Sequence, residues 1–291
     1  MYHTNKSSMN SSDAAGSVNF ASEPSAALFT GGSGAPATRS HSGAVHVVPV
    51  PDAFGSSSAL AEALYRLFEI MIALLGLIFG FPIMLLQGVL IRLDSPGPVL
   101  FFQTRTQRSA MVRGRELKGR RDLQPPPGGY EPDRLYYVPV YFRLVKFRTM
   151  YSDSRRRFPE LYDFKFAPDE FHQRHYKQEH DPRVTRVGAV LRKLSVDELP
   201  NLWCVLAGNM RLVGPRPEVP EILPYYTPDE MYKFACKPGV TGLAQINGRG
   251  LLSWGETLKW DLKYVHTRSV WLDLKIMLKT LKNVTLRRGA F

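Results

Sequence analysis

The chain has 291 residues, a formal net charge of +12 and two cysteines. Two cysteines are too few for a disulfide framework, and neither Cys204 nor Cys236 has the spacing of a zinc site, so a secreted disulfide scaffold is excluded and a reducing compartment is favoured. Residues 1–60 carry a net charge of −1, which leaves +13 on residues 61–291, an excess that suits phosphate groups, anionic lipid or nucleic acid.

Residues 1–58 are predicted to form a flexible tail. They are rich in Ser, Gly, Ala and Pro, and such segments bury too little apolar surface to offset the entropy of ordering the chain. The first residues lack a basic segment followed by an apolar core, so they do not form a secretory signal. We therefore expect one folded unit to follow the tail.

Residues 59–93 are predicted to form a membrane helix. No charge interrupts the stretch from Ile70 to Leu86, and Arg92 ends it. Pro82 lies inside this stretch, where it removes a backbone donor and clashes with the preceding turn, so we expect a break at Phe81 and Pro82.

Basic residues at both ends of this helix bear on its topology. Arg66 and Arg92 both favour the anionic cytoplasmic side, so we expect a re-entrant helix–break–helix that enters and leaves the same leaflet. Such a break requires protein contacts at Phe81 and Pro82, because lipid offers no hydrogen-bond partner. A kinked single span and a helix buried in a soluble core are the alternatives.

Residues 94–291 are predicted to form the cytoplasmic body. A turn at residues 95–98 precedes a strand-like VLFFQ, and residues 105–135 have the arginine and proline content of an exposed loop, either solvated or in contact with substrate or lipid. The sequence LYYVPVYFRLVKFRTM then predicts a short strand pair. It ends in Lys146 and Arg148, and basic residues at a strand end can hold phosphate.

Acidic residues follow a predicted helix in the stretch DPRVTRVGAVLRKLSVDELPNL, where Val187, Val190, Leu191 and Leu194 share one helical face. Ser195 and Glu198 have the spacing of a capping box, which would give Glu198 a structural role alone. Asp197 would then lie in the first turn of the next helix, where the helix dipole favours a carboxylate. An ionised aspartate can also attack phosphorus, and Mg²⁺ could relieve the repulsion between the two carboxylates.

Further cations follow this acidic pair. Arg216 lies between prolines in GPRP, nineteen residues after Asp197, and a stiffly held guanidinium suits bidentate phosphate recognition. The glycine-rich KPGVTGLAQINGRG adds Arg249. Residues 256–286 alternate large apolar residues with lysines, which fits either an interfacial helix on anionic lipid or packing into the core.

These blocks, in this order, resemble the bacterial sugar transferase family of monotopic polyprenyl-phosphate phosphoglycosyl transferases. The blocks that carry the resemblance, from about residue 64 onward, are the Pro-containing apolar helix, LDSPGPVLF, KFRTM, DPRVTRVGAVLRKLSVDELPNL, LVGPRP, KPGVTGLAQINGR and WDLKYVHTRSVWLDLKIMLKTL. The usual Ser-Pro at the helix break is Phe81-Pro82 here, and the 105–135 segment replaces a shorter turn. Because only the tail precedes the catalytic unit, the chain resembles the minimal form of the family.

The resemblance implies a mainly helical α+β fold with a small β-sheet, and an enzyme at the cytoplasmic face of the bacterial inner membrane. It implies that Asp197 attacks the sugar-bearing phosphate of a UDP-sugar, that UMP leaves, and that polyprenyl phosphate accepts the phospho-sugar, which initiates assembly of an exopolysaccharide or another glycoconjugate. Glu198 would be the Mg²⁺ ligand. The phosphate-binding residues would be Lys146, Arg148, Arg192, Arg216 and Arg249.

Two other interpretations compete with this one. A basic membrane-anchored protein that binds nucleic acid or anionic lipid would fit the charge, but it leaves the DELP and GPRP blocks unexplained, and the sequence has no nucleic-acid motif. A catalytically dead scaffold of the same fold is disfavoured because Asp197 and Glu198 are both present. We therefore expect a UDP-sugar, polyprenyl phosphate and anionic lipid as partners, no nucleic acid, and a homodimer as a further possibility.

Overall fold

The computed structural model describes residues 43–51, 59–175, 181–248 and 251–285. Most of the predicted tail lies outside these ranges, as does Arg249. The described residues form the expected α+β fold, in which small sheets pair strands from distant parts of the sequence.

Helix forms the larger share of the described structure. The α-helices are α1 (Ala59–Asp94), α2 (Ser154–Arg157), α3 (Pro168–Phe171), α4 (Arg186–Leu194), α5 (Asn201–Leu206), α6 (Leu243–Gly248), α7 (Trp254–Thr267) and α8 (Val270–Thr285). The 3₁₀ helices are η2 (Gly114–Glu116), η3 (Pro159–Tyr162), η4 (Pro220–Tyr225) and η5 (Asp229–Ala235). The strands are β1 (Val45–His46), β2 (Val48–Pro49), β3 (Leu100–Thr106), β4 (Ala110–Arg113), β5 (Leu123–Gln124), β6 (Leu135–Val138), β7 (Tyr141–Phe147), β8 (Arg211–Val213) and β9 (Gly239–Thr241).

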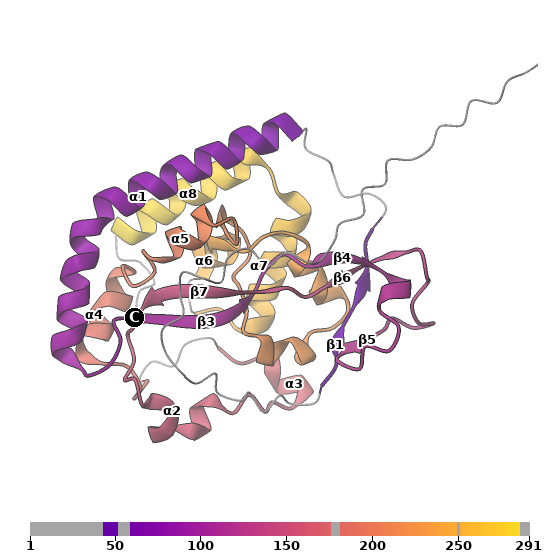
Figure 1. Cartoon of the computed structure of the whole chain (residues 1–291), viewed down its shortest axis with the longest axis horizontal. Coiled ribbons are helices and arrows are strands. Elements are labelled where there is room, and N and C mark those ends of the chain that lie inside the picture. The colour runs from indigo at the N-terminus through magenta and orange to yellow at the C-terminus, as the bar shows by residue number, and fades with distance from the viewer. Residues whose placement is uncertain (1–42, 52–58, 176–180, 249–250, 286–291) are drawn as a thin grey trace, which may run out of the picture. The chain divides into compact units, whose positions relative to one another are not determined.

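Helix α1 runs through its proline without interruption, so Phe81 and Pro82 do not end helical structure. Figure 1 shows a change of direction along α1 instead. A proline inside a helix removes one hydrogen bond and can bend the helix without ending it. Phe81 is 55% exposed and Pro82 is exposed, so the predicted protein contacts at these two residues remain a prediction.

The apolar surface of α1 is left largely uncovered by the described protein. In its most apolar window only 17% of the residues are buried, and the helix is long and apolar enough to cross a membrane. Isolated exposed apolar side chains are common, but a continuous apolar surface of this length marks a site of interaction. This excludes the alternative in which residues 59–93 form the buried helix of a soluble core.

The antiparallel pair β3 and β7 forms the central sheet, with a register that runs from Leu100 opposite Phe147 to Thr106 opposite Tyr141. Both strands were expected, but β3 extends into the predicted loop. The expected pairing of β6 with β7 is wrong. β6 pairs instead with β2 and β4, because Pro139 and Val140 lead the chain from one sheet to the next.

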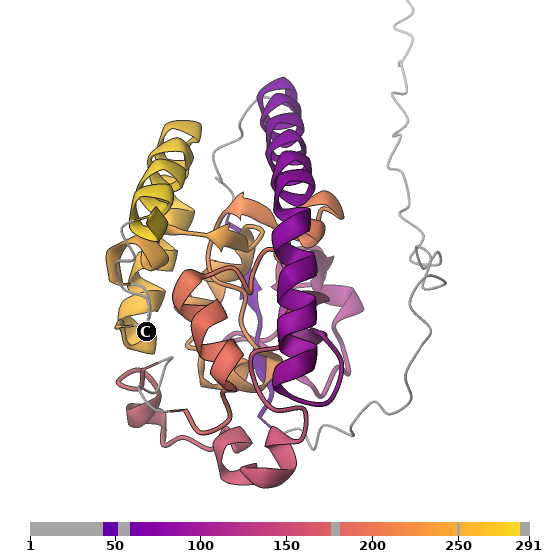
Figure 2. The same cartoon turned by 90° about the vertical axis from the view of Figure 1, so that its left-hand side faces the viewer.

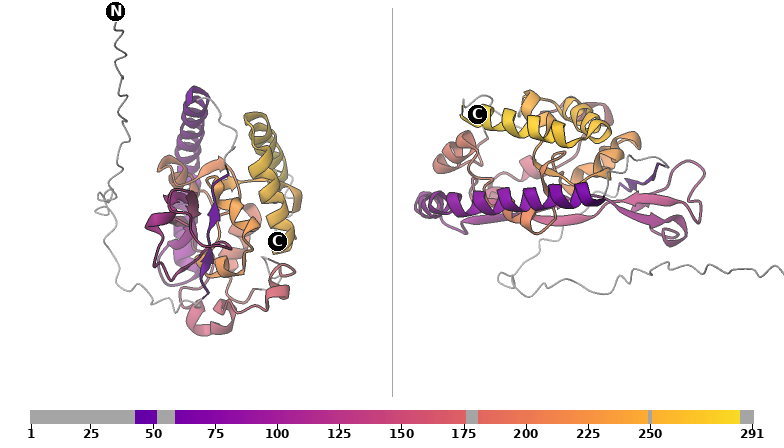
Figure 3. Two further views of the ribbon diagram at one scale, coloured as in Figure 1. Left: turned by 90° about the vertical axis from the view of Figure 1, so that its right-hand side faces the viewer. Right: turned by 90° about the horizontal axis from the view of Figure 1, so that it is seen from above.

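A small β-module is formed by residues 45–49 and 110–138. β1 pairs with β5, and β2 pairs with β6, so a segment predicted to belong to the tail is bound by the segment predicted to be a loop. Buried apolar side chains fill it: Val47, Leu117, Leu123, Tyr136 and Val138. Figure 1 and the right view of Figure 3 show the module beyond the β3–β7 sheet, at the end away from α4. The predicted flexible tail is therefore wrong for residues 45–49, and the predicted exposed loop is wrong for the residues that form β4 and β5.

The segment predicted as one interfacial or core helix is two helices. α7 begins at a capping box formed by Ser253 and Glu256, and its Leu258 and Tyr264 are buried, so α7 belongs to the core. On α8, Trp271 is 75% exposed and Leu278 is 69% exposed. Figure 2 shows α8 standing apart from α1. An interfacial role therefore remains a prediction for α8 alone.

The main core joins the central sheet to the helices around it. Its buried members come from α1, β7, α5, β8, α6, α7 and α8, namely Ala73, Phe142, Leu144, Val145, Cys204, Val205, Met210, Leu212, Val213, Leu243, Tyr264 and Ile276. Both cysteines are thiols, as expected, and Cys204 is a buried core residue. The end of β7 and the turn between α4 and α5 meet in a second cluster, in which Phe147 and Leu191 pack with Val196.

Candidate active site

The turn between α4 and α5 carries the acidic pair. The predicted capping box is wrong: Ser195 ends α4 in a left-handed conformation (φ 58°), and α5 begins only at Asn201. The Ser195 N–H donates to the Arg192 carbonyl at 3.1 Å and the Val196 N–H to the Leu191 carbonyl at 3.2 Å, as in a Schellman helix end.

Pro200 explains why no helix begins at Ser195. In such a helix Pro200 would lie in the interior, where it lacks a donor and its ring clashes with the Val196 carbonyl. It also disfavours helical conformation at Leu199. The chain instead makes a turn in which the Asn201 N–H donates to the Glu198 carbonyl at 2.9 Å. Asp197 and Glu198 are thus presented by a turn rather than by a helix N-terminus.

Asp197 is held at the end of the central sheet. Its carbonyl accepts a hydrogen bond from the Phe147 N–H of β7 at 2.9 Å, and the residue is only 7% exposed. Burial, and then the neighbouring Glu198, raise the pKa of the Asp197 carboxyl, whereas Lys146 and Arg192 oppose that rise. The environment therefore combines a desolvated carboxylate with two cations that stabilise its charge.

Lys146 is the strand-end cation of β7. Burial, and then Arg105, lower the pKa of Lys146 to about 8, although Asp197 and Glu198 favour its charged form. Its ammonium lies 5.5 Å from the centre of the Phe101 ring, a cation–π contact across the β3–β7 pair. Lys146 is therefore a cation whose charge is easily lost, next to the acidic pair.

Arg192 reaches the same region from α4. Its Nε donates to Thr149 Oγ1 at 2.8 Å, and burial lowers its pKa while Asp197 raises it. The α4 backbone packs tightly here, since a Cβ on Gly188 would lie 2.1 Å from the Thr149 carbonyl oxygen. Glycine at position 188 therefore sets the distance between α4 and the chain that follows β7.

A small cleft lies beside the acidic pair. It brings together three residues predicted for the site: Lys146, Glu198 and Arg216. Its full lining is Arg105, Leu144, Lys146, Glu198, Asn201, Met210, Arg216, Pro217, Gly239, Val240 and Gln245. Phosphate-directed cations and an acidic residue from distant segments thus share one concave surface.

Arg105 is the site residue that sequence reasoning missed. It was placed in the predicted loop, but β3 continues to Thr106, and Arg105 lies opposite Phe142 in the ladder that pairs Phe101 with Lys146. Paired residues share a face, and alternation puts Arg105 and Lys146 on the same face of the sheet. Extending the period-two pattern of VLFFQTR by two residues would have identified it.

Arg148 and Arg249 stand apart from this cleft. Arg148 does not line it, and its terminal nitrogens donate to the Pro96 carbonyl at 2.6 Å and the Ser95 carbonyl at 2.7 Å. The structure thus gives Arg148 a role in fixing the turn after α1, and we do not include it in the proposed phosphate site. Arg249 lies outside the described residues, so its role remains a prediction.

The cleft also offers oxygen atoms of the kind that Mg²⁺ prefers. Glu198 lines it, and the buried side-chain oxygens of Asn201 and Gln245 have no hydrogen-bond partner within the described part of the chain. Among the described residues there is no cluster of three or more His, Cys, Asp and Glu. Mg²⁺ typically uses one or two carboxylates together with substrate phosphates rather than an all-protein cage, so this set of donors fits it.

The fold and the cleft define an enzyme site with a buried carboxylate among cations, suited to phosphate-bearing substrates. The family model for "Bacterial sugar transferase" matches residues 60–114 and 126–287. The chain belongs to this family. The segments that build β1 and β2, and residues 115–125, lie outside the match, so part of the β-module is an addition to the family pattern.

Several relatives agree with this assignment. The chain is 32% identical over 242 residues to the exopolysaccharide production protein ExoY of Sinorhizobium fredii, covering 83% of the chain and 94% of that protein. It is 33% identical to a UDP-N-acetylgalactosamine-undecaprenyl-phosphate N-acetylgalactosaminephosphotransferase of Aeromonas hydrophila, over 77% of the chain and 44% of that protein. It is 35% identical to an undecaprenyl-phosphate glucose phosphotransferase of Komagataeibacter xylinus, over 78% of the chain and 36% of that protein.

Proposed function

We propose that this enzyme transfers a sugar phosphate from a UDP-sugar to undecaprenyl phosphate or a similar polyprenyl phosphate, with release of UMP, and so initiates assembly of an exopolysaccharide or related glycoconjugate. The observation that carries the proposal is the nearly buried Asp197 with Glu198, Lys146 and Arg192 as its charged neighbours, beside a cleft that also holds Arg216. The names of the relatives, which include two undecaprenyl-phosphate phosphotransferases, support this choice of acceptor.

In the proposed reaction, an Asp197 carboxylate oxygen attacks the sugar-bearing phosphorus. A bond forms between this oxygen and phosphorus, the bridging P–O bond of the diphosphate breaks, and UMP leaves with the bridging oxygen. A phosphate oxygen of the lipid then attacks the same phosphorus, which releases Asp197 and gives a polyprenyl diphospho-sugar. Asp197 is suited to this role because it is desolvated yet kept near two cations.

The cations of the cleft would bind and orient the diphosphate. Arg105 and Arg216 can offer planar guanidinium donors, and Lys146 a compact charge, to phosphate oxygens on which negative charge gathers. Glu198, with the Asn201 and Gln245 oxygens, would hold Mg²⁺. When bound, Mg²⁺ would withdraw charge from the phosphate oxygens and offset the repulsion between the two neighbouring carboxylates.

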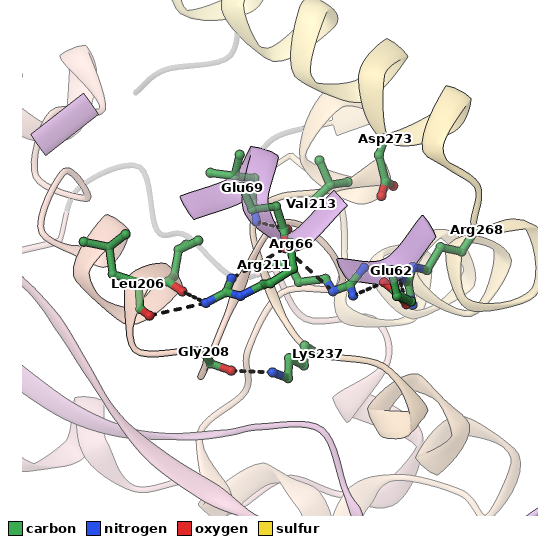
Figure 4. A network of polar contacts seen from close by, with 12 residues as sticks. Glu62, Arg66, Glu69, Leu206, Gly208, Arg211, Val213, Lys237, Arg268 and Asp273 are labelled. Carbon is green, nitrogen blue, oxygen red and sulfur yellow. Dashed lines mark hydrogen bonds and ion pairs between the residues drawn. The ribbon is translucent and has the colours of Figure 1, made fainter. Parts of the chain in front are cut away.

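We further propose that the enzyme sits at the cytoplasmic face of the bacterial inner membrane with α1 as a re-entrant helix. The support comes first from a polar network that binds the start of α1 to the body (Figure 4). Arg211 of β8 contacts Glu62 at 2.5 Å, and the Leu212 N–H donates to the fully buried Glu69 at 2.9 Å. Arg66 donates to the Val205 carbonyl of α5 at 2.5 Å.

The other end of α1 is bound to the same body. The Asp94 carboxylate accepts the Val187 N–H of α4 at 3.2 Å, and buried Ile91 packs with Phe147 and Leu191. A helix that crosses the bilayer would place its two ends on opposite sides. A body that carries this many charges would remain on one side, so contacts at both ends favour entry and exit through one leaflet.

Release of UMP tests the proposed reaction. The purified protein in detergent, with Mg²⁺ and a panel of UDP-sugars, should release UMP from at least one donor when polyprenyl phosphate is present. Asp197→Asn should fold normally and release none. Full activity of Asp197→Asn would reject the nucleophile, and a wild-type protein that is inactive with every UDP-sugar would reject the donor class.

Cysteine labelling tests the proposed topology. A single cysteine placed in the tail, within residues 1–42, should react with a membrane-impermeant maleimide only after the cytoplasmic side is exposed. Labelling of intact cells from outside would instead establish a crossing helix. A cysteine in the body at exposed Lys259 provides the matched cytoplasmic control.

A further inference from the structure

Three charged side chains are completely buried beneath the loop that carries Arg216. Lys233 of η5 forms ion pairs with Glu218, which follows the loop, and with Asp261 of α7, where Nζ lies 3.0 Å from Oδ2. All three side chains have no exposed surface. The carboxylates of Glu218 and Asp261 outweigh the effect of burial and raise the pKa of Lys233, so the lysine is an ammonium at neutral pH.

The cluster is attached directly to the loop. Burial raises the pKa of Asp261 to about 6, while Lys233 and then the Arg216 backbone lower it. Glu218 is only two residues beyond Arg216. The Glu218 N–H donates to Thr106 Oγ1 at 2.8 Å, and its carbonyl accepts the Thr106 N–H at 2.8 Å. Glu218 therefore connects the loop both to Lys233 of the cluster and to Thr106 of β3.

The same loop is tied to the cleft on its other side. Arg105 Nη1 donates to the Pro217 carbonyl at 3.1 Å, so one cation of the cleft supports the backbone next to another. The Gly239 N–H donates to the Pro215 carbonyl at 2.9 Å. Pro215, Pro217 and Glu218 thus each have a contact that fixes the loop on either side of Arg216.

Burying three charged side chains carries a large desolvation penalty. A buried ion triad is often no more stabilising than well-packed apolar side chains of the same volume, so its presence suggests a need for a defined geometry. The element whose geometry it defines is the Arg216 loop. An error of about 1 Å in a phosphate-binding group can reduce the rate on the order of 100-fold, which makes this precision valuable.

We propose that Glu218, Lys233 and Asp261 are positioning residues that hold the Arg216 loop so that its guanidinium meets the diphosphate of the donor. This inference rests on the proposed function. It assigns no contact with substrate to the three buried residues; they act through the backbone of Arg216.

A double-mutant cycle between Asp261 and Arg216 tests the inference. Asp261→Ala removes one of the two carboxylates paired with Lys233 and leaves Lys233 with Glu218 alone, a neutral pair. We expect kcat/KM for the UDP-sugar to fall about 10-fold or more in the wild-type background. In an Arg216→Ala background the same change should cost less than about 2-fold, because there is no guanidinium left to position. Asp261→Asn, which restores an oxygen acceptor, should recover most of the loss.

Glu230→Gln is the matched control, since Glu230 lies on the same η5 segment but contacts His172 at 2.7 Å and the Thr227 N–H at 2.8 Å instead. It should leave kcat/KM unchanged. Equal losses from Asp261→Ala in both backgrounds would show a general structural role and overturn the inference, as would an unchanged kcat/KM. If neither Asp261 variant yields folded protein by thermal melting, the cluster serves the whole fold and the inference also fails.

Failure of the proposed function would be visible separately. A wild-type protein that releases no UMP, or an Arg216→Ala variant as active as the wild type, would reject the proposed reaction or site without reference to Asp261. The positioning role is rejected only when Arg216→Ala itself lowers kcat/KM. In that case it fails if Asp261→Ala leaves kcat/KM unchanged, lowers it equally in both backgrounds, or does not fold.

Discussion

Replacing Lys146 with methionine should stabilise the protein while it abolishes transfer. The cleft holds an ammonium that burial makes unfavourable: the pKa of Lys146 falls from its ordinary 10.5 to about 8. The folded protein binds this proton more weakly than the unfolded chain does, so the charge opposes folding at neutral pH and opposes it less as pH rises from about 8 to 10.5. Methionine keeps the length of the side chain and removes the charge.

The lysine's pKa sets the size of the expected gain. A fall from 10.5 to about 8 corresponds to about 3 kcal/mol at about 1.4 kcal/mol per unit. Because Lys146 is only partly buried, water at the cleft reduces this, and we expect a gain of about 1–2 kcal/mol. For a body of this size that is a rise of roughly 2–8 °C in melting temperature.

Thermal melting in detergent at pH 7 measures this gain, and UMP release measures the loss of activity. The wild-type kcat/KM should decline above about pH 8 as Lys146 loses its proton, and Lys146→Arg, which stays charged, should lack that decline. A Lys146→Met protein that is less stable than the wild type, or that still transfers sugar phosphate, would refute this account of the lysine.

Three further changes have defined outcomes. Gly188→Ala should force α4 away from Thr149 and cost about 1–3 kcal/mol by overpacking, seen as a lower melting temperature with reduced UMP release. Removal of residues 1–42 should leave the melting temperature unchanged, whereas removal of residues 1–51 should lower it, because β1 and β2 pair with the β-module. Glu69→Ala should cost about 1–3 kcal/mol, because the Leu212 N–H loses its acceptor and the half-buried Arg66 of α1 and Arg211 of β8 lose a carboxylate partner, measurable by denaturation in detergent.

The parts of the fold that follow local patterns were predictable. The apolar run gave α1, alternation gave β3 and β7, and helical spacing gave α4, of which Leu191 is buried as expected. Val190, on the same predicted face, is 56% exposed, because α4 packs through a narrower stripe. Periodicity identifies an element, but it does not say how much of one face the neighbours cover.

The errors came from competition between local signals and from distant pairing. The Ser195–Glu198 spacing satisfied a capping box, but Pro200 prevented the helix, and the real box lies at Ser253 and Glu256. The pairing of β1 with β5 and of β2 with β6 could not be predicted, since two-residue strands carry almost no pattern of their own.

The sequence predicted the kind of site, an acidic residue among phosphate-binding cations, better than it predicted which cations line it. Lys146, Glu198 and Arg216 do line one cleft, although they lie far apart in the sequence. Arg148 has the same strand-end position as Lys146, yet it donates to the Ser95 and Pro96 carbonyls. No sequence pattern predicts these two hydrogen bonds. Arg105 required a strand two residues longer than the one predicted.

The central claim is that Asp197 becomes covalently bound to the sugar phosphate. The direct measurement is intact-protein and peptide mass spectrometry of the enzyme quenched in acid after incubation with Mg²⁺ and its UDP-sugar, with no polyprenyl phosphate present. We predict a mass increase equal to one sugar phosphate on the peptide that contains Asp197, lost when polyprenyl phosphate is added and absent from Asp197→Asn. An active enzyme that never carries this mass, or that carries it on another residue, would contradict the proposed mechanism.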